Sequence, residues 1–193
     1  MKKRVGVLAL QGDFEAHERA LVRAGAEPVQ VRTGEELANV EGLVIPGGES
    51  TTMLKLLDFM DLREPLRRFA GEKPVFGTCA GAILLAKEVC NPDQESFGTV
   101  DMTVERNAYG RQIDSRVARI LPDPDFQQRA GAGELEAVFI RAPIIRRTGP
   151  GVKVLAEYEG NPVLVEQGKT LIATFHPELT KDSRVHKLFL SKL

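Results

Sequence analysis

One cysteine stands in a setting that a buried structural cysteine would not need. Cys79 lies in the run GTCAG, where an apolar segment, residues 74–78, meets a segment with helical spacing. The pattern G-x-nucleophile-x-G is typical of a sharp strand-to-helix turn, which strains the nucleophile and requires small neighbours. A helix start favours a thiolate, and adjoining N–H groups, including that of Ala80, would face an oxyanion. The alternative is a small-residue junction that contains a cysteine by chance.

A cysteine nucleophile requires a base, and the sequence contains three histidines. His176 ends the apolar run LIATF and is followed by a proline and Glu178. In an extended chain, side chains two residues apart point the same way, so Glu178 would fix the tautomer of His176 and support its charged form. We interpret His17 and His186, both on predicted helices, as packing or surface residues. The sequence thus predicts a Cys79–His176–Glu178 triad; the alternative is a strand end before a solvated glutamate.

The run PGGES follows another buried apolar segment. Gly47 and Gly48 allow a sharp turn and bring backbone N–H groups close together, as an oxyanion hole requires. The alternative is an ordinary glycine turn, capped by Ser50 or Thr51. The two cysteines and three scattered histidines have no metal-ligand spacing, and no P-loop or G-x-G-x-x-G run occurs. We therefore predict neither a metal nor a cofactor.

The first half of the chain alternates between predicted strands and helices. Continuously apolar runs predict strands buried on both faces, and the 3.6-residue period predicts helices. Strands are expected at residues 4–10, 27–32, 42–49 and 74–78, and helices at 13–25 (capped by Asp13), 50–70 (divided at Pro65) and 80–89. This order predicts a parallel sheet with helices on its faces, in which loops 11–12, 47–49 and 78–80 meet at the carboxyl ends of the strands.

The second half, after about residue 91, has a β-rich pattern. Alternating segments predict half-exposed antiparallel strands, and residues 122–126 and 131–133 are expected to be loops. Strands are expected at residues 100–107, 111–120, 137–143, 152–158, 162–167 and 170–177, and a helix at 182–190. With no repeat or flexible linker in the sequence, we predict one domain over residues 1–193, its second half built onto the first sheet.

Composition argues against several classes of protein. Of the 193 residues, 42% are hydrophobic, and the net charge of −1 comes without basic runs, which argues against a nucleic-acid partner. Two cysteines, Cys79 and Cys90, make no disulfide framework and indicate a reducing compartment. No segment reaches the roughly 20 apolar residues of a membrane span, and the first apolar run is too short for a signal peptide. We expect a cytoplasmic protein.

Three motifs in this order, PGGES, GTCAG and FHPE, resemble those of the class I glutamine amidotransferases, which are triad glutaminases. Longer stretches are similar to the glutaminase subunits of pyridoxal 5′-phosphate synthase (the PdxT/SNO type) over nearly the whole chain: LALQGDFEAHE, PGGESTTM, PVFGTCAGAILLAKE, VERNAYGRQIDS, VFIRAP and FHPELT. The resemblance implies a flavodoxin-like, three-layer α/β fold. In it, an open, mostly parallel sheet carries helices on both faces, and an antiparallel β element is added in the second half.

The resemblance also implies roles for the matching residues. Cys79 would attack the side-chain amide of L-glutamine, His176 would protonate the leaving ammonia, and Glu178 would orient His176; a glutamyl thioester would then be hydrolysed to L-glutamate. An oxyanion hole is implied at Gly47, Gly48 and Ala80, and a substrate site at Gly48, Glu49, Ser50, Arg106, Ile140 and Arg141.

A partner is implied as well. The ammonia would pass to a TIM-barrel synthase subunit in a hetero-oligomeric complex that makes pyridoxal 5′-phosphate (vitamin B6). Gln11 would lie near the oxyanion hole and the partner interface. Glutaminases of this type are weak until the partner docks, so we hypothesise that Gln11 and the Gly47-Gly48 backbone form a gate.

Two alternative functions stay open. Another triad glutaminase, such as one feeding imidazole or nucleotide synthesis, would share the triad but need a different partner surface. A non-enzymatic redox or stress protein would form a sulfenate at Cys79 without hydrolysing glutamine; FHPE argues against it, because a sensor needs no oriented His–Glu pair. A cysteine peptidase is disfavoured, since nothing predicts a groove for an extended chain. Cys90, near the end of the helix expected after Cys79, should be structural.

Overall fold

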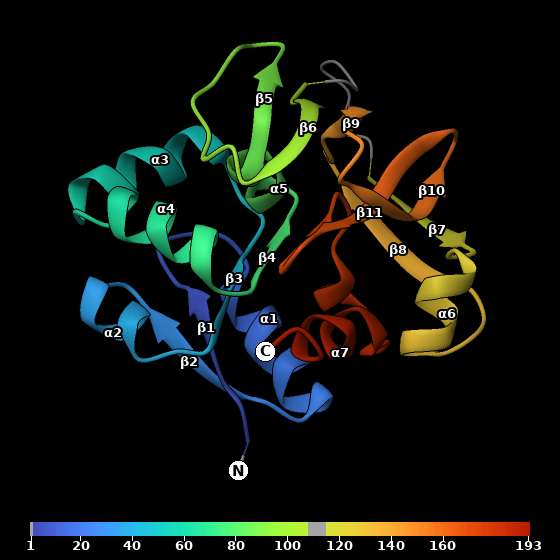
Figure 1. The fold of residues 1–193 in the computed structure, drawn as a ribbon, viewed down its shortest axis with the longest axis horizontal. Coiled ribbons are helices and arrows are strands. Elements are labelled where there is room, and N and C mark those ends of the chain that lie inside the picture. The colour runs from blue at the N-terminus through green and yellow to red at the C-terminus, as the bar shows by residue number, and fades with distance from the viewer. Residues whose placement is uncertain (1, 108–114) are drawn as a thin grey trace.

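The computed structural model describes residues 2–107 and 115–193. Within them, a seven-stranded sheet has the order β10-β11-β12-β4-β3-β1-β2 (Figure 1). The strands from β12 to β2 are all parallel, and β10 and β11 extend this sheet with antiparallel pairing. The strands are β1 Arg4–Leu8, β2 Glu27–Val31, β3 Gly42–Ile45, β4 Val75–Thr78, β10 Lys153–Tyr158, β11 Asn161–Gln167 and β12 Thr170–Ala173. The predicted mostly parallel α/β sheet is confirmed.

Helices cover both faces of this sheet, which confirms the predicted three layers. Alternate residues of the central strands enter different cores, because successive side chains of a strand point to opposite faces: Ile45 and Val75 join one cluster, Val44 and Phe76 the other. The first cluster includes α2 Gly34–Ala38, α3 Ser50–Phe59, α4 Arg63–Glu72 and α5 Ala80–Leu85; the second includes α1 Phe14–Ala24, α6 Pro124–Ala130 and α7 Arg184–Leu190 (Figure 1).

The added β element consists of two smaller sheets. In one, β6 (Val100–Glu105) pairs in parallel with β5 (Ala86–Cys90) and antiparallel with β9 (Ile144–Thr148). In the other, β7 (Ser115–Ile120) and β8 (Leu135–Ile140) are antiparallel. Part of the motif VERNAYGRQIDS and of the strand expected at 111–120 falls on residues 108–114, outside the described residues.

Two helix predictions were wrong in their bounds. The helix after Cys79 ends at Leu85, and the chain then forms β5, so Cys90 lies on a strand rather than near a helix end. Here pairing with β6 overrides the local helical spacing. The stretch 50–70 divides at Asp61, which has a φ of 53°, and not at Pro65. Pro65 lies in the first turn of α4, where a missing N–H costs no hydrogen bond.

Local capping accounts for two helices that the sequence analysis did not predict. Residues 122–126 were expected to be a loop, but α6 begins at Pro124, and the Asp123 side chain accepts a hydrogen bond from the Phe126 backbone N–H at 2.8 Å. The short helix α2, which we did not predict, begins with a capping box between Thr33 and Glu36. Asp13 precedes α1 but makes no side-chain capping bond. Among the described residues, no helix has the length and apolar character to cross a membrane.

Candidate active site

Cys79 lies on the sharp turn between β4 and α5. Its φ of 47° and ψ of −102° are strained for a residue with a side chain. The turn is held in place because the Cys79 backbone N–H donates to the carbonyl of Ala173, at the end of β12, over 3.0 Å. The predicted sharp strand-to-helix turn, called the elbow below, is therefore present at the carboxyl ends of the central strands.

Close backbone packing explains the two glycines of GTCAG. A Cβ at Gly81 would lie only 2.2 Å from the carbonyl oxygen of Ile45, the last residue of β3. A Cβ at Gly77 would lie 2.8 Å from the backbone carbonyl of Gly81. Both distances are shorter than real Cβ contacts, so β3, β4 and α5 approach this closely only with glycine at both positions.

His176 and Glu178 form a buried pair. The His176 backbone N–H donates to Val138 on β8 at 2.8 Å, and the Nδ1 atom of His176 lies 2.7 Å from Glu178 Oε1. The reason given for this pairing was wrong: the chain after His176 is not extended but forms a 3₁₀ turn, Pro177–Leu179, that folds Glu178 back toward the ring.

The His176 ring and Cys79 flank the same glycine. A Cβ at Gly47 would lie 2.6 Å from Cε1 of His176 and 3.2 Å from Cβ of Cys79. Burial disfavours an imidazolium at His176, but its hydrogen bonds with Cys79 and Glu178 outweigh this effect and raise its pKa to about 10. Burial also opposes ionisation of Glu178, yet the neighbouring His17 and His176 lower the pKa of its carboxyl. The arrangement therefore favours an imidazolium–carboxylate pair beside the sulfur.

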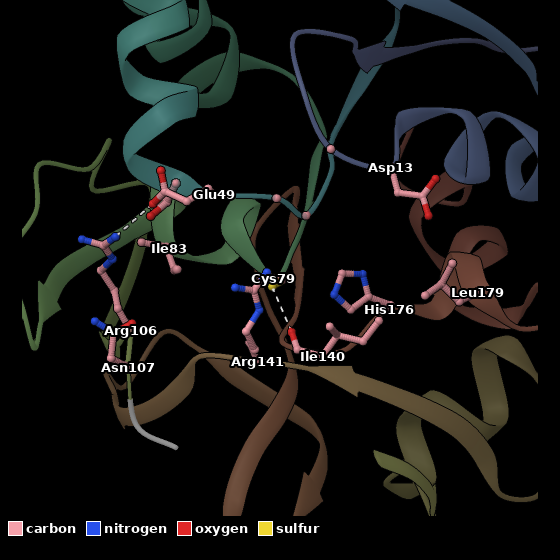
Figure 2. A pocket seen from close by; sticks show the side chains of 14 residues that line it. Asp13, Glu49, Cys79, Ile83, Arg106, Asn107, Ile140, Arg141, His176 and Leu179 are labelled. Atoms are coloured by element: carbon pink, nitrogen blue, oxygen red, sulfur yellow. Dashed lines mark hydrogen bonds and ion pairs between the residues drawn. The ribbon is translucent and has the colours of Figure 1, made fainter. Parts of the chain in front are cut away.

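A cavity of about 310 Å³ opens above this elbow. Figure 2 shows Cys79, Arg141 and His176 near its centre, with Glu49 and Arg106 to one side. Arg141, like Cys79, has a positive φ, of 45°, and the thiol lies 4.0 Å from the Ile140 carbonyl oxygen. The cavity is lined by Gly12, Asp13, Gly47, Gly48, Glu49, Ser50, Cys79, Ile83, Arg106, Asn107, Ile140, Arg141, His176 and Leu179.

Glu49 begins α3 and is tied down on several sides. Its carboxylate accepts hydrogen bonds from the backbone N–H groups of Thr51 and Thr52, at 3.1 and 2.7 Å, and from the Thr52 hydroxyl. Partial burial opposes ionisation, but these bonds outweigh it and lower the pKa of Glu49 to about 2. Arg106 donates to Glu49 at 3.3 Å and to the Thr51 hydroxyl at 2.9 Å. A fixed anion and a fixed cation thus stand together at one side of the cavity.

The glycine loop is held by Gln11. The Gln11 side chain donates to the Glu49 carbonyl at 3.3 Å and accepts from the Glu49 N–H at 3.4 Å. It covers Gly48 so closely that a Cβ there would lie 2.2 Å from Gln11 Nε2. Gly12 contacts the other side of the loop, since a Cβ on it would lie 1.9 Å from the Gly47 carbonyl oxygen. The conformation of the loop therefore depends on the segment that follows β1.

The structure does not place every predicted site residue on the cavity wall. Ala80 is fully buried in α5, Glu178 lies behind His176, and Gln11 lies over the loop. The Ser50 hydroxyl donates to Gln94 at 2.8 Å. Sequence reasoning missed five lining residues, three of which directly follow or precede predicted ones in the sequence: Gly12, Asp13, Ile83, Asn107 and Leu179. No group of three or more histidines, cysteines and acidic residues in the described part of the chain could hold a metal ion.

Comparison with solved structures assigns the class of fold. The chain resembles a solved glutamine amidotransferase with a TM-score of 0.87 and 47% identity, over 97% of each chain. A PurLQS structure from Thermotoga maritima, 17% identical with a TM-score of 0.72 over 99% of each chain, shares the fold alone. The fold is that of the class I glutamine amidotransferases.

Sequence relatives narrow this class. The model of the SNO glutamine amidotransferase family matches residues 7–193. A protein of Solibacter usitatus called pyridoxal 5′-phosphate synthase subunit PdxT is 68% identical, over 99% of this chain and all of the relative. A protein of the same name from Koribacter versatilis is 58% identical, over 97% of this chain and 94% of the relative. The chain belongs to the SNO glutamine amidotransferase family.

Proposed function

We propose that this chain hydrolyses L-glutamine to L-glutamate and ammonia through Cys79, His176 and Glu178. The observation that carries the proposal is the strained cysteine that shares a cavity with a histidine hydrogen-bonded to a buried carboxylate. The Cys79 sulfur attacks the amide carbon, and His176 gives its proton to the leaving nitrogen as the C–N bond breaks. Water, deprotonated by the now neutral His176, then attacks the thioester carbon, and the C–S bond breaks to release glutamate and leave the Cys79 sulfur beside a protonated His176.

The surrounding groups suit the charges of this reaction. We assign the oxyanion of each tetrahedral intermediate to the backbone at Gly47, Gly48 and Ala80, the last at the start of α5. The α-carboxylate of glutamine needs a cation, which Arg106 or Arg141 supplies, and the α-amine needs an acceptor, which Glu49 supplies. Ser50 and Ile140 complete the walls.

We infer that the ammonia passes to a second subunit. The relatives from Solibacter usitatus and Koribacter versatilis are called subunits of pyridoxal 5′-phosphate synthase, and at 68% and 58% identity they support the same role here. In this proposal residues 1–193 act as one glutaminase domain in the cytoplasm. The domain docks on a TIM-barrel synthase subunit in a hetero-oligomeric complex.

The loop contacts support a gate at the glycine loop. Gln11 clamps the backbone of Glu49 and covers Gly48, so a partner that moves Gln11 would also move the N–H groups assigned to the oxyanion hole. Partner docking thus adjusts the loop to the geometry of the transition state, and glutaminase activity depends on the complex.

The test is ammonia release from glutamine by the purified chain, alone and with the barrel synthase subunit. We expect release that rises when the synthase is added and that disappears in Cys79→Ala, which lacks the sulfur nucleophile. Alanine is small enough for the elbow, so this variant should keep its fold. Glu178→Gln should lose less activity than Cys79→Ala, because Glu178 orients His176 rather than transferring a proton. Equal rates with and without the synthase would refute the gate. No hydrolysis in the complex, with peroxide converting Cys79 to a sulfenate, would favour the redox alternative.

A further inference from the structure

Two of the three histidines contact the Glu178 carboxylate, and the third, His186, contacts one of these two. His17, on α1, and His186, on α7, are both fully buried behind the candidate active site. His17 Nδ1 lies 3.1 Å from His186 Nε2, and His17 Nε2 lies 3.0 Å from the Thr78 hydroxyl and 3.4 Å from Glu178 Oε2. Glu178 therefore has His176 against one oxygen and His17 against the other. The interpretation of His17 as a mere packing or surface residue omits this contact.

Both of these outer histidines are neutral. Their rings pack edge-on against the Phe76 ring, with centroids 6.1 Å (His17) and 5.5 Å (His186) away. Burial lowers the pKa of His17, and the repulsion of His176 lowers it further. The attraction of Glu178 and Asp13 raises this pKa, but by less. Burial likewise lowers the pKa of His186 to about 3, with repulsion from His17 and Arg23 and attraction from Glu178. Each ring therefore carries one proton.

The hydrogen-bond pattern decides which nitrogen of each ring holds the proton. His186 Nδ1 is buried and has no partner among the described residues. A buried N–H without an acceptor is costlier and rarer than a bare acceptor, so the His186 proton is on Nε2 and is donated to His17 Nδ1. His17 must then carry its own proton on Nε2, on the side of Thr78 and Glu178.

We propose that His17 is a positioning residue of the glutaminase, which shares its Nε2–H between Thr78 and the second oxygen of Glu178. The inference rests on the proposed function, because Glu178 acts only through His176. At 3.4 Å the contact is longer than a good hydrogen bond, yet Glu178 Oε2 is buried without any closer polar partner among the described residues. Held at both oxygens, the carboxylate keeps its charge and its orientation toward His176.

The first test requires no substitution. In the ¹⁵N-labelled chain, long-range ¹H–¹⁵N spectra at neutral pH report the tautomer of each histidine ring. We expect His17 as the neutral Nε2–H form, hydrogen-bonded, and a neutral Nε2–H form for His186. A proton on His17 Nδ1, or a doubly protonated His17, would overturn the proposal.

The second test measures the rate at which iodoacetamide alkylates Cys79 as a function of pH, and it needs no glutamine. The readout is the acid limb of this profile, the range in which the rate falls as the pH is lowered. Without the His17 donor the pKa of Glu178 rises, so the charge that supports the His176 imidazolium is lost at higher pH. In His17→Phe we expect the acid limb to move upward by about one pH unit, a tenfold change in protonation. His17→Gln, whose amide can donate to Glu178, should recover part of the shift.

A stability control separates positioning from packing. Phe126→Leu opens a buried site on α6, outside the cavity lining, and should lower stability without moving the acid limb. An acid limb in His17→Phe that coincides with that of the unaltered chain would refute the proposal, whichever tautomer is seen. If the unaltered chain does not hydrolyse glutamine in the complex, but His17→Phe still shifts the acid limb of alkylation, the result would count against the proposed function alone.

Discussion

Gly81→Ala tests whether the elbow requires its close backbone packing. The added methyl carbon would lie 2.2 Å from the Ile45 carbonyl oxygen and 3.1 Å from the carbonyl carbon. These are backbone atoms of β3, which cannot move aside as a flexible side chain can. Overpacking of this kind costs roughly 1–3 kcal/mol, and we expect a value near the top of that range.

The chain offers a matched control in Gly71, which lies in α4. A Cβ at Gly71 meets nothing within 4 Å, and no left-handed conformation is required there. Gly71→Ala should therefore stabilise the chain by about 0.5–1 kcal/mol, because alanine loses less backbone entropy in a helix. The same chemical change thus has opposite signs at the two positions, with a difference of about 3–4 kcal/mol.

Urea unfolding at pH 7 measures the stability of both variants. The rate of Cys79 alkylation and the rate of glutamine hydrolysis in the complex measure the effect on the site. Ile45 directly precedes the loop that holds Gly47, so a displaced β3 moves the loop relative to Cys79. A displacement of about 1 Å should lower hydrolysis about a hundredfold. Gly81→Ala with unaltered stability and activity would refute the close-packing explanation of GTCAG.

Two further predictions concern the cysteines and the buried histidines. A glutamine-like electrophile should label Cys79 and spare Cys90, which lies on β5 and does not line the cavity; equal labelling by mass spectrometry would contradict this. His186 stays neutral in the folded state to a pH of about 3, whereas the unfolded chain binds its proton near 6.5, so folding weakens as pH falls between these values. This linkage lowers the free energy of unfolding of the unaltered chain by about 2 kcal/mol at pH 5. Between pH 7 and 5, the free energy of unfolding of His186→Phe should therefore fall by about 2 kcal/mol less than that of the unaltered chain. Urea unfolding at both pH values measures the difference, and parallel losses in both chains would count against a buried neutral histidine.

The central sheet and the elbow could be predicted because each leaves a local signature. Parallel strands buried on both faces are continuously apolar, as in residues 42–45 and 75–78, and the elbow needs glycines at fixed offsets from Cys79. The end of α5 could not be predicted this way. Residues 86–90 have helical spacing, and only their pairing with β6, ten or more residues further on, makes them a strand.

The contacts of the cavity residues could not be predicted from local sequence patterns either. Glu49 was expected simply to face the substrate, but its carboxylate also begins α3 and pairs with Arg106, far along the chain. The family resemblance implied that Gln11 lies near the oxyanion hole, while its clamp on the Glu49 backbone depends on how β1 and β3 lie side by side. Sequence order identifies which loops meet, and packing decides which atoms touch.

The two outer histidines illustrate the same limit. A lone histidine on the apolar face of a helix is sensibly interpreted as a packing residue, and His17 does pack against Phe76. Phenylalanine would fill such a place as well, but it would leave Glu178 Oε2 and the Thr78 hydroxyl buried without this donor. An unsatisfied buried polar group costs about 1–3 kcal/mol, and more when it is charged. The polar ring at position 17 is therefore explained by the carboxylate behind the active site, which no neighbour in the sequence reveals.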